Sequence, residues 1–259
     1  MAELEFVRTE REGRVLVVTL NRPEVMNACH APMHHELHGV WNDFADDPEL
    51  WVAVLTGAGD RAFSAGNDLK ATHSGAGIDW PPTGFCGLTS RFDLEKPIVA
   101  AVNGVAMGGG FETALACDLI VASDKARFAL PEVRVGLFAA AGGVQRLSRQ
   151  IGRKAAAGMM LTGRTVHAEE AAALGIVNEV VPHEGLKARA LEVARDLAAV
   201  SPSSIKATKR VLNAMDVSDR LPESLAYSRE VSTELRATED AKEGVAAFVE
   251  KRAPEWRNR

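Results

Sequence analysis

Three consecutive glycines, Gly108, Gly109 and Gly110, stand just before a glutamate, Glu112. A strand-like apolar stretch precedes the glycines, and a helix is expected to follow them. Glycine exposes backbone N–H groups without side-chain obstruction, and the helix N-terminus adds the positive end of the helix dipole. Such a turn suits an oxygen atom that becomes negatively charged during a reaction, although a glycine cluster taken alone is more often only a tight turn.

Two glutamates, Glu112 and Glu132, are the candidate acid and base. Glu112 lies in the first turn of the expected helix, where a carboxylate interacts favourably with the dipole, and Glu132 follows Pro131 in an expected surface turn. Taken singly, each acid is more often structural than catalytic. Taken as a pair, with one carboxyl protonated and the other ionised, they can move protons. The segment 61–70 can present a further backbone N–H group near Asn67.

Alternating strand and helix signals surround these residues. A valine- and leucine-rich stretch ends at Pro23, which cannot continue a strand ladder. Apolar residues then follow at helical spacing, including Met33, Leu37 and Phe44. The strand, helix, strand order recurs, so we expect a layered α/β fold. The expected strands are 15–20, 51–55, 97–102 and 119–122, and the expected helices between them are 31–44 and 109–116.

Beyond His167 helical patterns dominate. Ser201 and Pro202 supply an N-cap and a first-turn proline for a helix over 201–214, and a last helix is expected over 239–252. We therefore expect a core that holds the active site, followed by a C-terminal helical region, with the division at residues 1–195 and 196–259. The last helix carries an apolar stripe that packs on its own core or, alternatively, on another subunit, and its members are Val245, Phe248 and Val249.

The stretch 71–89 is rich in glycine and proline and shows neither strand nor helix periodicity. We expect a long surface loop, of the kind that often forms a binding lid. Trp80, Phe85 and Phe92 lie in or near it and are candidates to line a substrate pocket, although aromatic residues are more often core.

The composition excludes several classes of function. The chain has 259 residues, of which 46% are hydrophobic, and its net charge of −5 argues against a nucleic-acid partner, which would need a basic surface. No basic stretch followed by an apolar run opens the sequence, and every apolar run is shorter than the ~20 residues of a membrane helix. We expect a cytoplasmic protein that does not act at a membrane.

Cysteine and histidine usage favours neither disulfides nor metal binding. Cys29, Cys86 and Cys117 show no C-x-x-C spacing, which fits a reducing compartment. His30 and His34 are placed one helical turn apart, but no third ligand accompanies them, so no metal site is expected.

Three motifs together resemble the enoyl-CoA hydratase (crotonase) superfamily in order and spacing: Ala65-Gly66-Asn67-Asp68-Leu69, the triple glycine with Glu112, and Pro131-Glu132. The resemblance runs from Asn21-Arg22-Pro23 to the segment 247–252. It implies a crotonase (ClpP-like) fold, a spiral of β-β-α units with a C-terminal helical region that assembles homotrimers, often paired as hexamers. It also implies an acyl-CoA thioester substrate, no cofactor beyond the CoA that the substrate carries, and a place in fatty acid metabolism.

The resemblance also assigns site residues. It implies that the N–H groups of Asn67 and Gly109 form an oxyanion hole for the thioester carbonyl, and that Glu112 and Glu132 together mark members that add or remove water. Glu112 would activate water and Glu132 would protonate carbon, but a shared role is equally compatible. The positions that match CoA-binding positions of the family are Ala28, Ala65, Gly66, Asp68, Leu69, Phe248 and Lys251.

Some segments, such as 84–89 and 239–244, resemble the carnitinyl-CoA dehydratase (crotonobetainyl-CoA hydratase) branch. That branch generally has proline and aspartate where this chain has Ala139 and Ala140, so the acyl pocket is expected to be more apolar, whereas a trimethylammonium group prefers an anionic or aromatic surround. Isomerisation of the double bond, which uses the same enolate, is a further alternative. A noncatalytic RNA-binding relative would need a basic helix face, which this sequence lacks.

Overall fold

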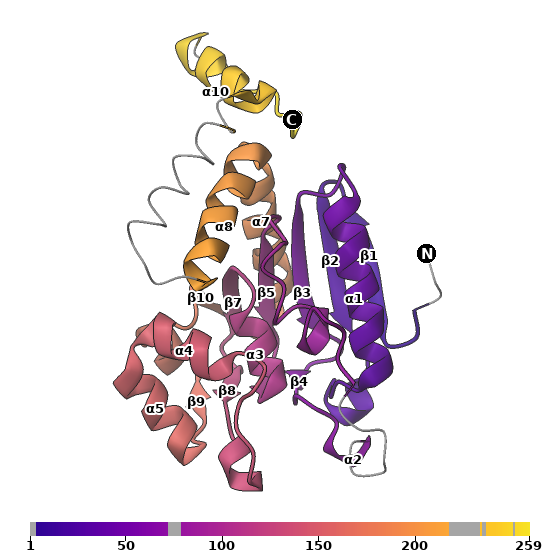
Figure 1. The fold of residues 1–259 in the computed structure, drawn as a ribbon, viewed down its shortest axis with the longest axis vertical. Helices are drawn as coiled ribbons and strands as arrows, with labels where there is room; N and C mark the ends of the chain where they lie inside the picture. The colour runs from indigo at the N-terminus through magenta and orange to yellow at the C-terminus, as the bar shows by residue number, and fades with distance from the viewer. Residues whose placement is uncertain (1–3, 72–78, 218–233, 235–236, 251) are drawn as a thin grey trace.

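The computed structural model describes residues 4–71, 79–217, 234, 237–250 and 252–259, which form two β-sheets with helices around them (Figure 1). The larger sheet has the strand order β1-β2-β3-β5-β7-β10, in which β1 is antiparallel to β2 and the other neighbours are parallel. The smaller sheet has the order β4-β6-β8-β9, with β8 antiparallel to β9. The strands are β1 (Val7–Glu12), β2 (Val15–Leu20), β3 (Val52–Gly57), β4 (Ala62–Ser64), β5 (Ile98–Val102), β6 (Val105–Met107), β7 (Leu119–Ser123), β8 (Arg127–Ala129), β9 (Val166–His167) and β10 (Glu179–Val181).

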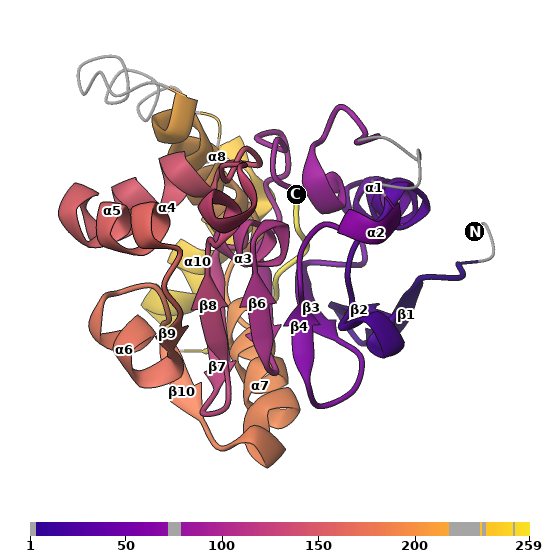
Figure 2. The same ribbon diagram turned by 90° about the horizontal axis from the view of Figure 1, so that it is seen from below.

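Consecutive strands are divided between the two sheets. The chain passes from β3 to β4, from β5 to β6 and from β7 to β8, each time leaving the larger sheet for the smaller one (Figure 2). It continues from β6 into α3 (Gly109–Leu115) and from β8 into a 3₁₀ helix, η4 (Glu132–Val135). Because β4, β6 and β8 are parallel neighbours, the segments that follow them meet at one end of the smaller sheet. This repeated path confirms the expected α/β fold.

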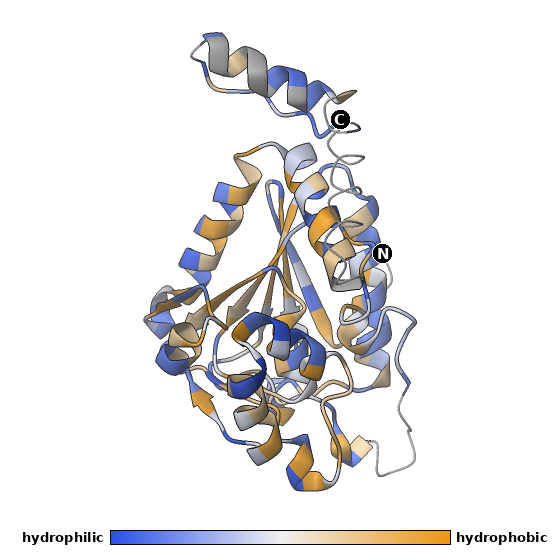
Figure 3. Cartoon of the chain, turned by 60° about the vertical axis from the view of Figure 1, so that its left-hand side comes forward, coloured by the Kyte–Doolittle hydropathy of each residue, from blue (hydrophilic) through white to orange (hydrophobic). Residues whose placement is uncertain are grey.

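The larger sheet is buried on both faces, as β2 illustrates. Val15 and Val17 belong to one apolar core, together with residues of α7 (Leu186–Ala198). Leu16 and Val18 belong to a second core, together with residues of α1 (Ala31–Asp46). A strand covered on both faces needs a continuous apolar run, which is why the sequence of β2 shows no polar alternation. Figure 3 shows strands coloured largely as hydrophobic between helices that carry both hydrophilic and hydrophobic residues.

The other helices surround the two sheets. Those described are α2 (Leu69–Ala71), α4 (Gly143–Ile151), α5 (Arg153–Thr162), α6 (Ala168–Ala173), α8 (Pro202–Val217) and α10 (Glu239–Glu250), and further 3₁₀ turns lie at Pro23–Val25, Phe85–Gly87 and His183–Gly185. The predicted cap of α8 is present, because the Ser204 N–H donates to Ser201 Oγ at 3.2 Å. None of the helices in the described ranges has both the length and the apolar character to cross a bilayer.

Strand β10 was not predicted. Helical patterns dominate beyond His167, yet Glu179–Val181 adds a parallel strand beside β7 at the edge of the larger sheet. All three of its residues are only half-buried, so its sequence lacks the apolar signature of the central strands.

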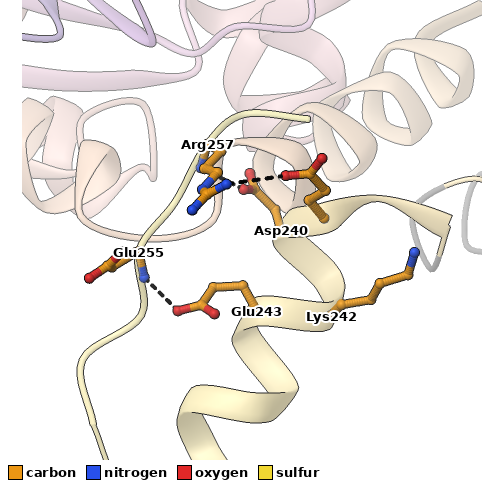
Figure 4. Close-up of a pocket in the computed structure, with 6 residues that line it drawn as sticks. Asp240, Lys242, Glu243, Glu255 and Arg257 are labelled. Carbon is orange, nitrogen blue, oxygen red and sulfur yellow. Dashed lines mark hydrogen bonds and ion pairs between the residues drawn. The ribbon is translucent and has the colours of Figure 1, made fainter.

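The chain's last residues fold back onto the start of α10. The buried carboxylate of Asp240 accepts hydrogen bonds from Ser203 Oγ (2.9 Å) and from the N–H groups of Arg257 (2.7 Å) and Asn258 (3.0 and 3.1 Å). A pocket of about 300 Å³ lies beside this contact, and Figure 4 shows Glu243, which lines it, accepting the Glu255 N–H. Asp240 thus joins α8, α10 and the C-terminal tail.

We expect Asp240→Ala to lower the free energy of unfolding by about 2 to 4 kcal/mol, because three donors lose a buried charged acceptor. Urea denaturation gives the stability, and the rate of tryptic cleavage after Arg252 reports release of the tail. Glu169→Ala is the matched control, since it removes an exposed acid from the first turn of another helix, α6. Equal stability and equal cleavage rates in both variants would show that Asp240 does not hold the tail.

Candidate active site

The turn between β6 and α3 is shaped by its glycines. Gly108 has φ +52°, and its N–H donates to Ala129 O of β8 at 3.0 Å. Gly109 is the first residue of α3, and amides in the first turn of a helix have no acceptor within that helix. A Cβ atom on Gly110 would lie 2.4 Å from Ser64 O, so only glycine fits against the end of β4.

The segment that carries Asn67 lies directly against this turn. Gly66 has φ +91°, and a Cβ atom there would lie 2.6 Å from Met107 O and 3.0 Å from Gly109 N. Asn67 is paired with Cys29 in a short parallel bridge, with the Cys29 N–H donating to Gly66 O and the Asp68 N–H donating to Cys29 O, both at 2.8 Å. The structure therefore brings Asn67 and Gly109 to one wall of the same cavity.

The two glutamates line that cavity from neighbouring segments. Glu112, in α3, is 3% exposed, and its Oε1 accepts the Gly143 N–H from the start of α4 at 2.8 Å. Glu132 begins η4, and its Oε1 lies 3.0 Å from the position that a Cβ atom on Gly108 would take. Its Oε2 is buried without a hydrogen-bond partner in the part of the chain that the structure describes. One carboxylate is thus fixed by an amide, while the other has an oxygen available for a ligand.

Burial makes both carboxyl groups weaker acids than usual. Loss of solvent, together with the nearby charge of Glu132, raises the pKa of Glu112 to about 7, against the opposing effects of the Gly143 amide and the Arg146 guanidinium. Burial also raises the pKa of Glu132. Two close carboxyl groups titrate as a pair, so the pair can hold one proton near neutral pH and act as acid and base at once.

The raised pKa of Glu112 predicts a stability cost above neutral pH. A carboxyl whose pKa rises from 4.5 to about 7 on folding binds protons more tightly in the folded chain. Its contribution to stability is complete below pH 4.5 and is lost as the pH rises through 7, by on the order of 3 kcal/mol. Glu112→Gln cannot ionise and still accepts the Gly143 N–H, so we expect it to gain stability over the wild type at pH 8 but much less at pH 5. Urea denaturation at both pH values measures this, and an equal difference at the two would contradict it.

The cavity of about 470 Å³ has mostly apolar walls. The Phe85 ring covers Gly109 so closely that a Cβ atom there would lie 2.5 Å from the ring, and Trp80 meets Phe85 edge to face at 5.7 Å between centroids. Phe92, also expected at the pocket, is absent from the lining and lies beneath the Arg146 guanidinium instead. The large apolar side chains of the lining are Leu69, Trp80, Phe85, Val135, Leu137 and Phe138.

Comparison with known proteins shows the family to which the chain belongs. The family model described as enoyl-CoA hydratase/isomerase matches residues 10–259. The chain belongs to the enoyl-CoA hydratase/isomerase family. Carnitinyl-CoA dehydratases from Citrobacter koseri and from Escherichia coli K12 are each 44% identical over 263 aligned residues, covering 98% of this chain and 99% of each relative.

Solved structures of the family confirm the crotonase fold. The crystal structure of an enoyl-CoA hydratase from Mycobacterium marinum matches with a TM-score of 0.93 at 37% identity, covering 98% of this chain and 99% of that one. That of a carnitinyl-CoA hydratase from Mycobacterium avium matches with a TM-score of 0.80 at 41% identity, covering 99% of this chain and 100% of that one.

Two of the positions expected from the family to contact CoA line the cavity in the described part of the chain. Ala65 and Leu69 line the cavity with Asn67, and Gly66 packs beneath them. Arg22, which we did not predict, donates to Ala28 O at 2.6 Å and to Asp68 Oδ2 at 3.0 Å.

The remaining candidates are not described in the structure. Lys251 lies outside the described residues, and the side chain of Phe248 is likewise not described. The side chains of Val245 and Val249, the other members of the apolar stripe, are also outside the described part of the structure.

Several residues of the candidate active site were not predicted from the sequence. No local sequence pattern indicated that the Gly143 amide would bind Glu112. Val135, Leu137 and Phe138 were not predicted to line the cavity. His34, weighed as a metal ligand, is instead buried with its Nδ1 accepting the Cys86 N–H at 3.0 Å.

Proposed function

We propose that the protein is an enoyl-CoA hydratase that adds water reversibly to the Cα=Cβ bond of a 2-enoyl-CoA thioester. The supporting observation is that Glu112 and Glu132 enter one cavity beside the turn that carries Gly109 and the segment that carries Asn67. No other arrangement of acids in the described residues combines burial, a raised pKa and adjacent backbone donors.

The reaction passes through an enolate, and the backbone stabilises it. The thioester carbonyl accepts hydrogen bonds from the N–H groups of Asn67 and Gly109, so negative charge collects on oxygen where donors are already in place. Each such donor is worth roughly 10²- to 10³-fold in rate. The dipole of α3 adds to this stabilisation, since Gly109, one of the two donors, is the first residue of that helix.

The two glutamates move the protons. The ionised carboxylate takes a proton from water while the water oxygen bonds to Cβ, and the protonated carboxyl delivers its proton to Cα. Dehydration runs through the same steps in reverse. We assign water activation to Glu112 and protonation of carbon to Glu132, as the family resemblance implies. Because the pKa of Glu112 is raised to about 7, the pair shares one proton before reaction, and the Gly143 N–H stabilises the state in which Glu112 is the ionised carboxyl.

A carnitinyl-CoA dehydratase is the second candidate. The aromatic lining residues, Trp80, Phe85 and Phe138, provide the kind of surround that binds a quaternary ammonium group through cation–π interactions. Ala140 lines the cavity at the position where that branch generally has an aspartate. The absence of this charge favours an uncharged acyl group. We therefore place simple 2-enoyl thioesters first and crotonobetainyl-CoA second.

Product analysis separates these activities. The purified protein is incubated with crotonyl-CoA and, in parallel, with crotonobetainyl-CoA, and the thioesters are examined by mass spectrometry. Gain of one water identifies a hydratase and its preferred acyl group, whereas unchanged mass with loss of the ultraviolet absorbance of the conjugated enoyl thioester identifies an isomerase. Absence of both changes with both substrates would refute the proposal.

We further propose that the enzyme needs no metal or cofactor, acts in the cytoplasm in fatty acid metabolism, and assembles as a homotrimer or as a hexamer of paired trimers. We retain the division into a core at residues 1–195 and a helical region at residues 196–259. Light scattering coupled to size-exclusion chromatography tests the assembly, and a monomer at working concentration would exclude it.

A further inference from the structure

Arg146 connects two walls of the active-site cavity without lining it. It lies one turn into α4, and its backbone N–H donates to Gly142 O at 2.9 Å. Its side chain folds back over the same turn, so that a Cβ atom on Gly142, which has φ +99°, would lie 2.3 Å from Nη1. The guanidinium therefore packs directly on the residue before Gly143, whose amide holds Glu112.

The Nη2 side of this guanidinium contacts the segment that carries Phe85, the aromatic wall of the cavity. Nη2 donates to Thr89 O at 2.9 Å, and the guanidinium carbon lies 5.7 Å from the centroid of the Phe92 ring. Thr89 is 3% exposed and is tied to Phe85 by two hydrogen bonds, since the Phe85 N–H donates to Thr89 Oγ1 at 2.9 Å and the Thr89 N–H donates to Phe85 O at 3.2 Å. Phe85 in turn covers Gly109.

We infer that Arg146 is a positioning residue for the proposed hydration: it fixes the Gly143 amide on Glu112 and the Phe85 wall over Gly109 in one arrangement. This inference rests on the proposed function. A guanidinium suits the task because its planar fork can pack on Gly142 and donate to Thr89 at the same time, which the single ammonium of lysine cannot do.

The charge of Arg146 acts on the same carboxyl. The charged groups with the largest influence on the pKa of Glu112 are Glu132 from η4, which raises it, and Arg146 from α4, which lowers it. Removal of the positive charge is expected to move the titration of Glu112 to higher pH. Loss of the packing is expected to displace the Gly143 amide, and small displacements of such groups cost about 10- to 100-fold in rate.

Two substitutions separate the charge from the packing. We expect Arg146→Gln to lower kcat for hydration about 10- to 100-fold with little change in KM, and to move the titration of Glu112 to higher pH. Arg146→Lys keeps the charge, so its titration should stay near that of the wild type while kcat remains reduced. Arg149→Gln removes the same charge one turn further along α4, from an exposed side chain, and should leave both measurements unchanged.

The titration is followed by carbon-13 NMR of protein labelled at its glutamates, with Glu112→Gln to assign the signal. An Arg146→Gln protein that folds and keeps both the wild-type kcat and the wild-type titration of Glu112 overturns the inference. A lower melting temperature with unchanged kcat in the folded fraction also overturns it, since the role would then be only structural. A wild type that hydrates neither test substrate overturns the proposed function instead, and the titration alone then decides whether Arg146 positions Glu112.

Discussion

Glu132→Gln is expected to fold normally and to lose hydration by about 10²- to 10⁴-fold in kcat, because the change is nearly isosteric and removes only the ability to exchange a proton. Glu132 is only partly buried, and in the described chain its Oε2 has no hydrogen-bond partner. Substitution therefore breaks no internal hydrogen bond of that oxygen. The loss should appear in kcat and not in KM, since the carboxyl acts on the reacting atoms and not on CoA.

Steady-state hydration of crotonyl-CoA, or of crotonobetainyl-CoA if that is the better substrate, measures the effect. Glu169→Gln provides the matched control, because Glu169 is an exposed acid in α6, remote in sequence from every lining residue. Near-wild-type kcat in Glu132→Gln would remove this residue from the chemistry and leave Glu112 as the only acid-base group of the site.

Gly109→Ala should lower kcat by about 10²- to 10³-fold, the cost of losing one oxyanion donor. An alanine Cβ atom would lie 2.5 Å from the Phe85 ring, so either the ring or the start of α3 must move. Movement of α3 carries the Gly109 N–H away from the carbonyl oxygen. Gly109→Pro would remove the N–H itself, but its ring would meet Phe85 as well, so the alanine variant is the cleaner test.

Two further variants decide the cause of this loss. Gly39→Ala is the control for a glycine in a helix, because nothing lies within 4 Å of a Cβ atom at that position. Combining Gly109→Ala with Phe85→Leu makes room for the new methyl group and should restore part of kcat. Wild-type kcat in the single Gly109→Ala variant would show that the Phe85 ring moves and the start of α3 does not, which contradicts the expected loss of the Gly109 donor.

The elements that were predicted from sequence are those with a strong local signal. Strand β2 was predicted at its observed bounds because both of its faces are buried and every residue of the run except Thr19 is apolar. Helix α1 was predicted from apolar residues on one face, and only its last turn, to Asp46, was missed. Strand β10 was missed because it is short and half-buried, and its place is fixed by pairing with β7 across the fold.

The residues of the candidate site also divide into those that a sequence motif marks and those that it does not. Glu112, Glu132, Asn67 and Gly109 were predicted as site residues from the family resemblance, and their meeting in one cavity follows from the parallel register of β4, β6 and β8. The groups that hold these residues in place and shift their pKa values, such as Gly143 and Arg146, are not marked by any motif. Gly143 reaches Glu112 across 31 residues, and Arg146 reaches Thr89 across 57, so only the folded chain brings these partners together.

The rim of the cavity gives the enzyme a route to new substrates. Val135, Leu137 and Phe138 are 58%, 55% and 66% exposed, and they belong to one short segment in which the Leu137 N–H returns to Glu132 O at 3.0 Å. Because these side chains project from a surface turn, exchanging them disturbs little of the core. Gly109 and Glu112, in contrast, are fixed by the sheets beneath them. Acyl selectivity can therefore drift by single substitutions in this rim while the reaction is inherited unchanged.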